Sequence, residues 1–153
     1  MSEVLRRKLH AHQDSKQLAE LLTQIASLTM VHFVTDVEDL GVDIAYQSVL
    51  NSDVQPLSRI AVSASQRDIA VWLHGLVKQA QLQGTCYLKV WDFGFAPWVE
   101  VRVNDSGEWL TSLWSHLKNH AFLIVNRERR ILLIIDEEEY WYEAYLRELP
   151  HQI

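Results

Sequence analysis

Two pairs of side chains have residue types and spacings that could support catalysis, and the first is a pair of histidines. His116 and His120 lie four residues apart in a segment with helical periodicity, so both imidazoles would point to one side, as two zinc ligands must. A zinc protease also needs a glutamate directly after the first histidine, and Leu117 occupies that position. Histidines near a helix C-terminus interact favourably with the helix dipole. We therefore favour helix-end or surface histidines over a metal site.

The second pair is Asp92 and Glu100, each of which closely follows a tryptophan. Aromatic neighbours raise the pKa of carboxyl groups and stack on sugars, which suits a glycosidase that uses two carboxylates. Valines alternate with other residues over 98–103, however, and this pattern indicates a strand with one buried face. The alternation predicts Glu100 on the solvent-facing side, where an ordinary carboxylate belongs.

Other catalytic signals are weak. Cys86 is the single cysteine, which excludes a disulfide within the chain, and its apolar neighbours indicate a buried strand thiol rather than a nucleophile. No serine lies in a nucleophile elbow, and no glycine pattern matches a phosphate-binding loop. We expect no catalytic residue, no metal and no cofactor.

The run DEEEYWYEAY, residues 136–145, places four consecutive carboxylates before a group of aromatic residues. Carboxylates in the first turn of a helix meet unpaired N–H groups and the positive end of the dipole, which accounts for them without any partner. Tyrosine and tryptophan also supply binding energy at interfaces, and clustered carboxylates speed the encounter with a basic protein. The two interpretations are compatible, and an extended strand remains an alternative to the helix.

Charge is distributed unevenly along this chain of net charge −6. Residues 17–58 hold six acids and no lysine or arginine, and residues 136–148 hold six acids against one arginine. If the two segments meet, they form one negative face, and its expected members are Asp36, Glu38, Asp39, Asp43, Glu137, Glu138, Glu139, Tyr140 and Tyr142. The basic clusters are short, so direct binding of nucleic acid is disfavoured.

The elements that position these residues follow from hydrophobic periodicity. Helices are predicted over 15–28, 65–84 and 105–117, with Asp14, Ser65 and Asp105 as their N-caps. Strands are predicted as a hairpin within 29–50 that turns near 39–41, as a short strand in 58–62, in 85–95 and 97–104, and as two central strands within 121–135.

These elements predict one α+β domain over residues 1–153, with a largely antiparallel sheet and helices packed on it. Residues 1–13 are expected to be disordered or to form a solvent-exposed helix turn. The first residues lack the apolar core of a signal peptide, and no stretch approaches the roughly 20 apolar residues of a membrane span. We therefore expect a cytoplasmic protein that does not contact the membrane.

The segment NHAFLIVNRERRILLIIDEEEYWYEAY, from Asn119 to Tyr145, lies in a small, acidic, cysteine-poor chain. In its small size, its acidity, its low cysteine content and this segment, the chain resembles the immunity proteins of bacterial polymorphic toxin systems, in particular those of contact-dependent growth inhibition. The resemblance includes no signature motif, so it implies a class of function and no individual site residue. It implies a non-catalytic inhibitor that binds a cognate toxin domain, often a basic nuclease.

Three alternatives remain open at the level of sequence. They are a metal-dependent hydrolase at His116 and His120, a glycosidase at Asp92 and Glu100, and a homo-oligomeric adaptor. The oligomeric state is not determined by the sequence.

Overall fold

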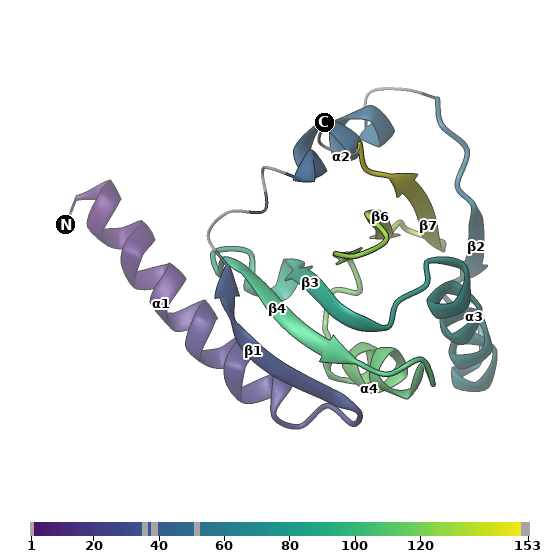
Figure 1. Cartoon of the computed structure of the whole chain (residues 1–153), viewed down its shortest axis with the longest axis horizontal. Helices are drawn as coiled ribbons and strands as arrows, with labels where there is room; N and C mark the ends of the chain where they lie inside the picture. The colour runs from purple at the N-terminus through teal and green to yellow at the C-terminus, as the bar shows by residue number, and fades with distance from the viewer. Residues whose placement is uncertain (1, 35–36, 38–39, 51–52, 151–153) are drawn as a thin grey trace.

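The centre of the fold is an antiparallel sheet. The computed structural model describes residues 2–34, 37, 40–50 and 53–150, and within them the seven strands follow the order β1-β4-β3-β5-β6-β7-β2. The strands are β1 (Leu28–Val34), β2 (Ser58–Ala61), β3 (Gly84–Val90), β4 (Trp98–Val103), β5 (Phe122–Asn126), β6 (Ile131–Glu137) and β7 (Trp141–Glu148). The helices are α1 (Glu3–Leu22), α2 (Val42–Leu50), α3 (Gln66–Gln79) and α4 (Glu108–His116), with a 3-10 turn, η2 (Trp91–Phe93). The predicted α+β class is confirmed (Figure 1).

The sheet is covered on both faces. Helices α1, α3 and α4 pack on one face, where Leu18, Leu73 and Leu113 join the larger core. Helix α2 packs on the other face, and a smaller core there contains Val49 with Leu123. Every residue of β5 is buried because successive side chains point into different cores. The prediction of two central strands apolar on both faces is therefore confirmed for β5 and β6.

Helix α1 begins far earlier than the periodicity indicated. Ser2 caps it by accepting a hydrogen bond from the backbone N–H of Leu5 (3.2 Å), and every residue from Ser2 to Leu9 is exposed. These first turns project beyond the sheet (Figure 1). The expected cap Asp14 lies inside the helix, where its carboxylate accepts from the N–H of Phe95 (3.0 Å).

Helix α3 begins as the sequence predicts, whereas the start of α4 differs. Ser65 caps α3 by accepting from the N–H of Asp68 (3.1 Å). Gly107, with a φ of 81°, is the N-cap of α4 in place of Asp105. Gly84 has a φ of 77°, which favours glycine, and it begins β3 after α3 has already ended at Gln79.

Across the described residues, no helix has the length and apolar character that a membrane crossing requires.

The predicted strand within 42–50 is wrong, because this segment forms α2. Val42 and Val49 are buried, and Tyr46 lies between them at helical spacing. The expected turn near 39–41 lies partly outside the described residues.

The predicted helix from Asp136 is also wrong. Asp136 and Glu137 end β6, and the aromatic residues from Trp141 onward belong to β7, which pairs with β6 along its length. Tyr142 and Ala144 point into the larger core, whereas Glu143 and Tyr145 point to the face that α2 covers. The alternative of an extended strand describes this segment correctly.

Candidate functional site

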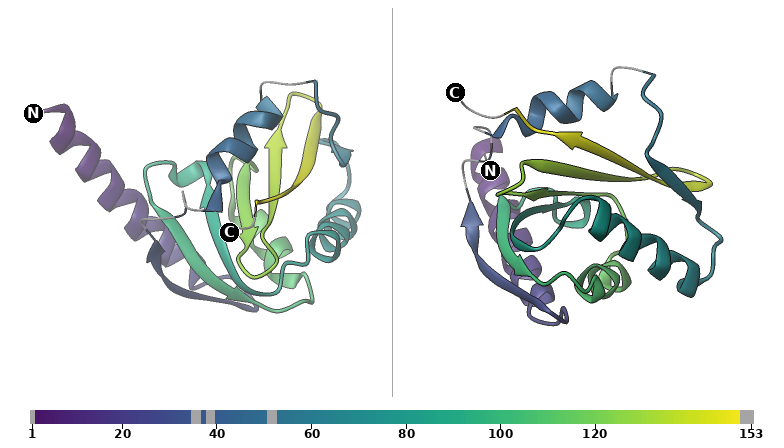
Figure 2. Two further views of the ribbon diagram at one scale, coloured as in Figure 1. Left: turned by 45° about the horizontal axis from the view of Figure 1, so that its top comes forward. Right: turned by 45° about the vertical axis from the view of Figure 1, so that its right-hand side comes forward.

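A pocket of about 250 Å³ lies between α2, η2 and the β6–β7 hairpin. Its buried lining is apolar and comes from Val49, Leu123 and Ile134, which belong to the smaller core. Figure 2 shows α2 lying beside β6 and β7, and both border this pocket, although its two acidic residues, Asp136 and Glu138, come from the hairpin alone.

Aromatic side chains from three elements line the pocket. Tyr46 comes from α2, Trp91 from η2 and Tyr145 from β7. The rings of Tyr46 and Trp91 are 6.0 Å apart and tilted by 55°, and Trp91 is 45% exposed. Solvent therefore reaches part of the tryptophan ring beside the pocket.

The acidic part of the pocket comes from the end of the hairpin. Asp136 lies opposite Glu143 in the β6–β7 register, so their carboxylates share the face that α2 covers. Glu138 follows in the turn, where its backbone N–H donates to the carbonyl of Trp141 (2.8 Å). Among the described residues, no ion pair within 4.0 Å connects these three carboxylates to a basic side chain. Asp136 and Glu138 therefore have no ion-pair partner among the described residues, whereas Glu143 lies opposite Arg59 in the β2–β7 register.

The crowding of carboxylates affects the titration of the neighbouring groups. A side-chain hydrogen bond with Asp136 raises the pKa of Glu138, and the negative charge of Asp136, burial and the charge of Glu143 raise it further. Burial raises the pKa of Tyr46 and of Tyr145, and the nearby carboxylates add to both shifts. Both tyrosines therefore stay neutral at physiological pH, and their hydroxyls keep their protons.

The substitution Glu138→Gln is expected to raise the melting temperature at neutral pH. The pKa of Glu138 is higher in the folded protein than in the unfolded protein. At pH values between these two pKa values, the folded protein binds a proton that the unfolded protein has lost. The free energy of unfolding therefore falls as the pH rises through this range. Above this pH range Glu138 is charged and is repelled by Asp136 and Glu143. Glutamine removes this repulsion and keeps a hydrogen-bonding group near Asp136. Thermal unfolding at neutral and at acid pH measures the gain.

The control for this substitution is Glu139→Gln, which removes the same charge from the next exposed residue of the turn. The gain from Glu138→Gln should shrink at acid pH, where the glutamate is itself protonated. A gain of equal size at both pH values, or an equal gain from the control, would contradict the assigned cause.

The residues expected on one partner-binding face do not all lie on the same face of the structure. Asp36, Glu38 and Asp39 lie outside the described residues, and the structure places the others as follows. Asp43 is exposed on α2, and Glu138, Glu139 and Tyr140 are exposed in the β6–β7 turn, with Tyr140 68% accessible.

Glu137 and Tyr142 lie on the opposite face of the sheet and are not part of this surface. The Glu137 carboxylate contacts His120 Nδ1 (3.1 Å), and Tyr142 is only 6% exposed, in the larger core. Because side chains alternate along a strand, neighbours in the acidic run point to different faces. The prediction for these two residues is corrected.

Sequence reasoning missed five contributors to the site: Tyr46, Trp91, Asp136, Glu143 and Tyr145. Asp136 and Glu143 could have been paired by treating 131–148 as a hairpin. We call one set of exposed and half-buried residues the acidic–aromatic surface. It consists of the pocket residues Tyr46, Trp91, Asp136, Glu138 and Tyr145, of Glu143 opposite Asp136, and of the exposed residues Asp43 on α2 and Glu139 and Tyr140 in the β6–β7 turn.

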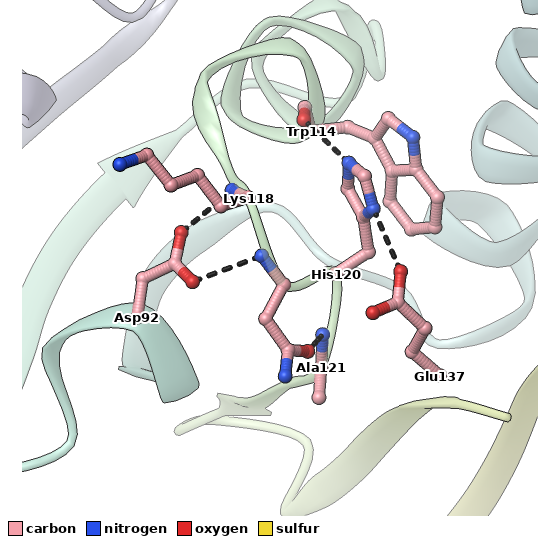
Figure 3. A network of polar contacts seen from close by, with 7 residues as sticks. Asp92, Trp114, Lys118, His120, Ala121 and Glu137 are labelled. Carbon is pink, nitrogen blue, oxygen red and sulfur yellow. Dashed lines mark hydrogen bonds and ion pairs between the residues drawn. The ribbon is translucent and has the colours of Figure 1, made fainter.

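The two histidines that could have held a metal make separate contacts. His120 stacks on Trp114 (ring centroids 4.2 Å apart), and its ring nitrogens face the Glu137 carboxylate and the Trp114 carbonyl (Figure 3). His116 Nδ1 lies 2.8 Å from the carbonyl of Ser112. In the part of the chain that the structure describes, no group of three or more His, Cys, Asp or Glu side chains is arranged to hold a metal. The geometry gives the metal-dependent hydrolase no support.

The two carboxylates suspected of catalysis, Asp92 and Glu100, also make structural contacts. The Asp92 carboxylate accepts from the backbone N–H groups of Lys118 (2.7 Å) and Asn119 (2.9 Å), and so fixes the loop after α4 (Figure 3). Glu100 is 8% exposed and lies 3.8 Å from Arg127, so its predicted solvent-facing position is wrong. It is buried because it lies beside Tyr87 on the neighbouring strand, under the side chain of Arg127.

Cys86 is a buried strand thiol, as predicted. It is fully buried, and burial raises its pKa to about 12. A thiol with this pKa is almost entirely protonated at neutral pH and is a poor nucleophile.

Comparison with protein-family models, with curated proteins and with solved structures finds no match to this chain. The functional assignment therefore depends on the chemistry of the site.

Proposed function

We propose that this protein is a non-catalytic binding protein of the immunity type, which acts in the bacterial cytoplasm. Its acidic–aromatic surface would capture a basic protein, the toxic domain of a cognate toxin. One observation carries the proposal: carboxylates without a basic partner lie beside accessible aromatic rings at one pocket.

The composition of this surface suits protein recognition. Tyrosine and tryptophan are enriched among the residues that dominate binding energy, and both types are present here. Uncompensated carboxylates attract a positively charged partner and speed the encounter. At about 250 Å³ the pocket is also smaller than the roughly 300–1,000 Å³ of most small-molecule sites. At this pocket a protein side chain is therefore favoured over an organic substrate.

The side chains that could have supported catalysis are engaged elsewhere. Asp92 holds a loop, Glu100 lies beside Arg127, and His120 contacts Glu137. None of these groups lines the acidic pocket. This arrangement favours a binding role over an enzymatic one.

The toxin as partner follows from charge and from the resemblance to immunity proteins. A nuclease must hold phosphates, so the groove that does so is basic. An acidic surface can occupy such a groove and exclude the nucleic acid. The aromatic rings would then provide the apolar contact that holds the complex together.

Affinity capture from a lysate of the source organism tests the proposal, followed by coexpression of the captured domain with this protein. We expect a basic domain whose toxicity disappears when this protein is present. The double variant Asp136→Lys/Glu138→Lys should bind that domain well over tenfold more weakly, because it reverses the charge at the pocket. Binding is measured with the purified pair by calorimetry at moderate salt.

The matched control is Glu20→Lys/Asp105→Lys, which makes the same change in net charge. Glu20 is exposed on α1 and Asp105 is exposed in the loop before α4, and neither lines the pocket. If both double variants bind the domain equally well, the acidic–aromatic surface is not the binding site. If the captured domain stays toxic in the presence of this protein, the immunity function is wrong.

A further inference from the structure

The acidic pocket has a size that suits a single side chain. Its volume is about 250 Å³, below the roughly 300–1,000 Å³ of most small-molecule sites. The pocket therefore has room for several heavy atoms but less than most organic cofactors need.

The aromatic rings of the pocket are suited to a cation. A guanidinium or ammonium group binds over an aromatic face when it lies within about 6 Å of the ring centre, and arginine does so more often than lysine. Arg59 lies 4.3 Å from the Trp141 ring, and Arg127 lies 5.9 Å from the Tyr87 ring. Among the described residues, no such cation lies over Trp91, although this ring is 45% exposed beside the pocket.

The carboxylates of the pocket favour guanidinium over ammonium. Asp136 and Glu138 are close enough to hydrogen-bond each other, and such a bond between two carboxyl groups requires one proton between them. A planar guanidinium carries five N–H donors in a fixed fork and can serve both carboxylates at once. An ammonium group is a compact, strongly hydrated charge that loses more on leaving water.

We propose that the pocket formed by Tyr46, Trp91, Asp136 and Glu138 binds the guanidinium group of one arginine side chain. If the partner is a basic protein, as proposed above, this arginine is its anchor residue. The guanidinium lies against the aromatic rings and donates to both carboxylates.

Titration of the isolated protein with N-acetyl-arginine methylamide, followed by NMR, tests the pocket without any partner. The indole N–H signal of Trp91, assigned with Trp91→Phe, should shift in a saturable way. The analogue with citrulline in place of arginine has nearly the same shape without the charge, and it should cause no saturable shift. The lysine analogue should bind at least threefold more weakly.

The double variant Asp136→Asn/Glu138→Gln should lower the affinity for the arginine probe more than tenfold. The control Glu20→Gln/Asp105→Asn removes two charges elsewhere and should leave it unchanged. The NMR spectrum itself reports whether each variant is folded. Equal binding of the citrulline or lysine analogue, or no saturable shift up to the solubility limit of the arginine probe, would overturn the inference.

The two proposals fail in different ways. If the arginine probe binds as expected and no toxic domain is captured, the pocket stands and the immunity function fails. If a toxic domain is neutralised and the arginine probe does not bind, the function stands and the arginine anchor is wrong.

Discussion

Replacement of Trp109 by alanine is expected to lower the free energy of unfolding by about 3–5 kcal/mol. Trp109 lies in the first turn of α4, is 0% exposed and belongs to the larger core. Removing its indole leaves a cavity that the sheet and three helices can fill only partly. Urea denaturation followed by circular dichroism measures the loss.

Trp109→Phe is the matched control because it keeps an aromatic ring and removes only the larger indole. The Trp109 indole N–H is buried and has no hydrogen-bond partner among the described residues. A buried donor without a partner destabilises the fold, so its removal offsets part of the lost packing. We expect phenylalanine to be much less destabilising than alanine. Equal losses would show that the indole N–H contributes to stability.

Replacement of Trp114 by alanine is expected to have an effect of similar size, about 3–5 kcal/mol. Trp114 stacks on His120 with ring centroids 4.2 Å apart and meets the edge of Tyr142 at 4.7 Å. Aromatic pairs of this kind contribute about 0.5–1.5 kcal/mol beyond the area they bury. A double-mutant cycle with His120→Ala should therefore give a coupling energy in that range.

The matched control is Trp141→Ala, which removes the same side chain from a site that is 38% exposed, where Arg59 covers the ring. Its loss should stay near 1 kcal/mol, because an exposed cation–π contact contributes about 0.5–1 kcal/mol. Equal losses from the two tryptophans would contradict the assignment of Trp114 to the core.

The parts of the fold that the sequence predicted correctly depend on strong local signals. The run ILLII has apolar side chains at successive positions and β-branched residues at both ends, a pattern typical of a strand covered on both faces. Ser65 and Asp68 have the spacing of a helix cap, and the structure contains that cap. Burial and local hydrogen bonding act in the same direction in these segments, so the sequence is sufficient.

The incorrect predictions fall where local propensity and tertiary pairing disagree. Residues 42–50 are rich in β-branched and aromatic residues, yet they form α2 because Val42 and Val49 can then face the sheet together. The acids from Asp136 suit a helix start, yet β6 offers a continuous row of backbone partners to β7. Pairing along a whole strand stabilises more than one helix cap can.

The candidate site was only partly predictable for a related reason. Glu138 was identified from the acidic run itself, and it lines the pocket. Tyr46 and Trp91 are far apart in the sequence, and no local pattern connects them. They meet because α2 folds back over the sheet beside η2. Contacts of this kind depend on the tertiary fold and not on local spacing.

The position of β2 affects how the protein can fold during synthesis. This strand ends the sheet, and it pairs with β7, the last of the seven described strands in sequence order. Residues 58–61 therefore leave the ribosome well before their partner exists. A chain released before β7 would leave β2 and one side of β6 with unpaired N–H and C=O groups, the surfaces through which strands aggregate. Premature termination would produce an aggregation-prone fragment. The full chain, in contrast, has its most apolar strands, β5 and β6, inside the sheet.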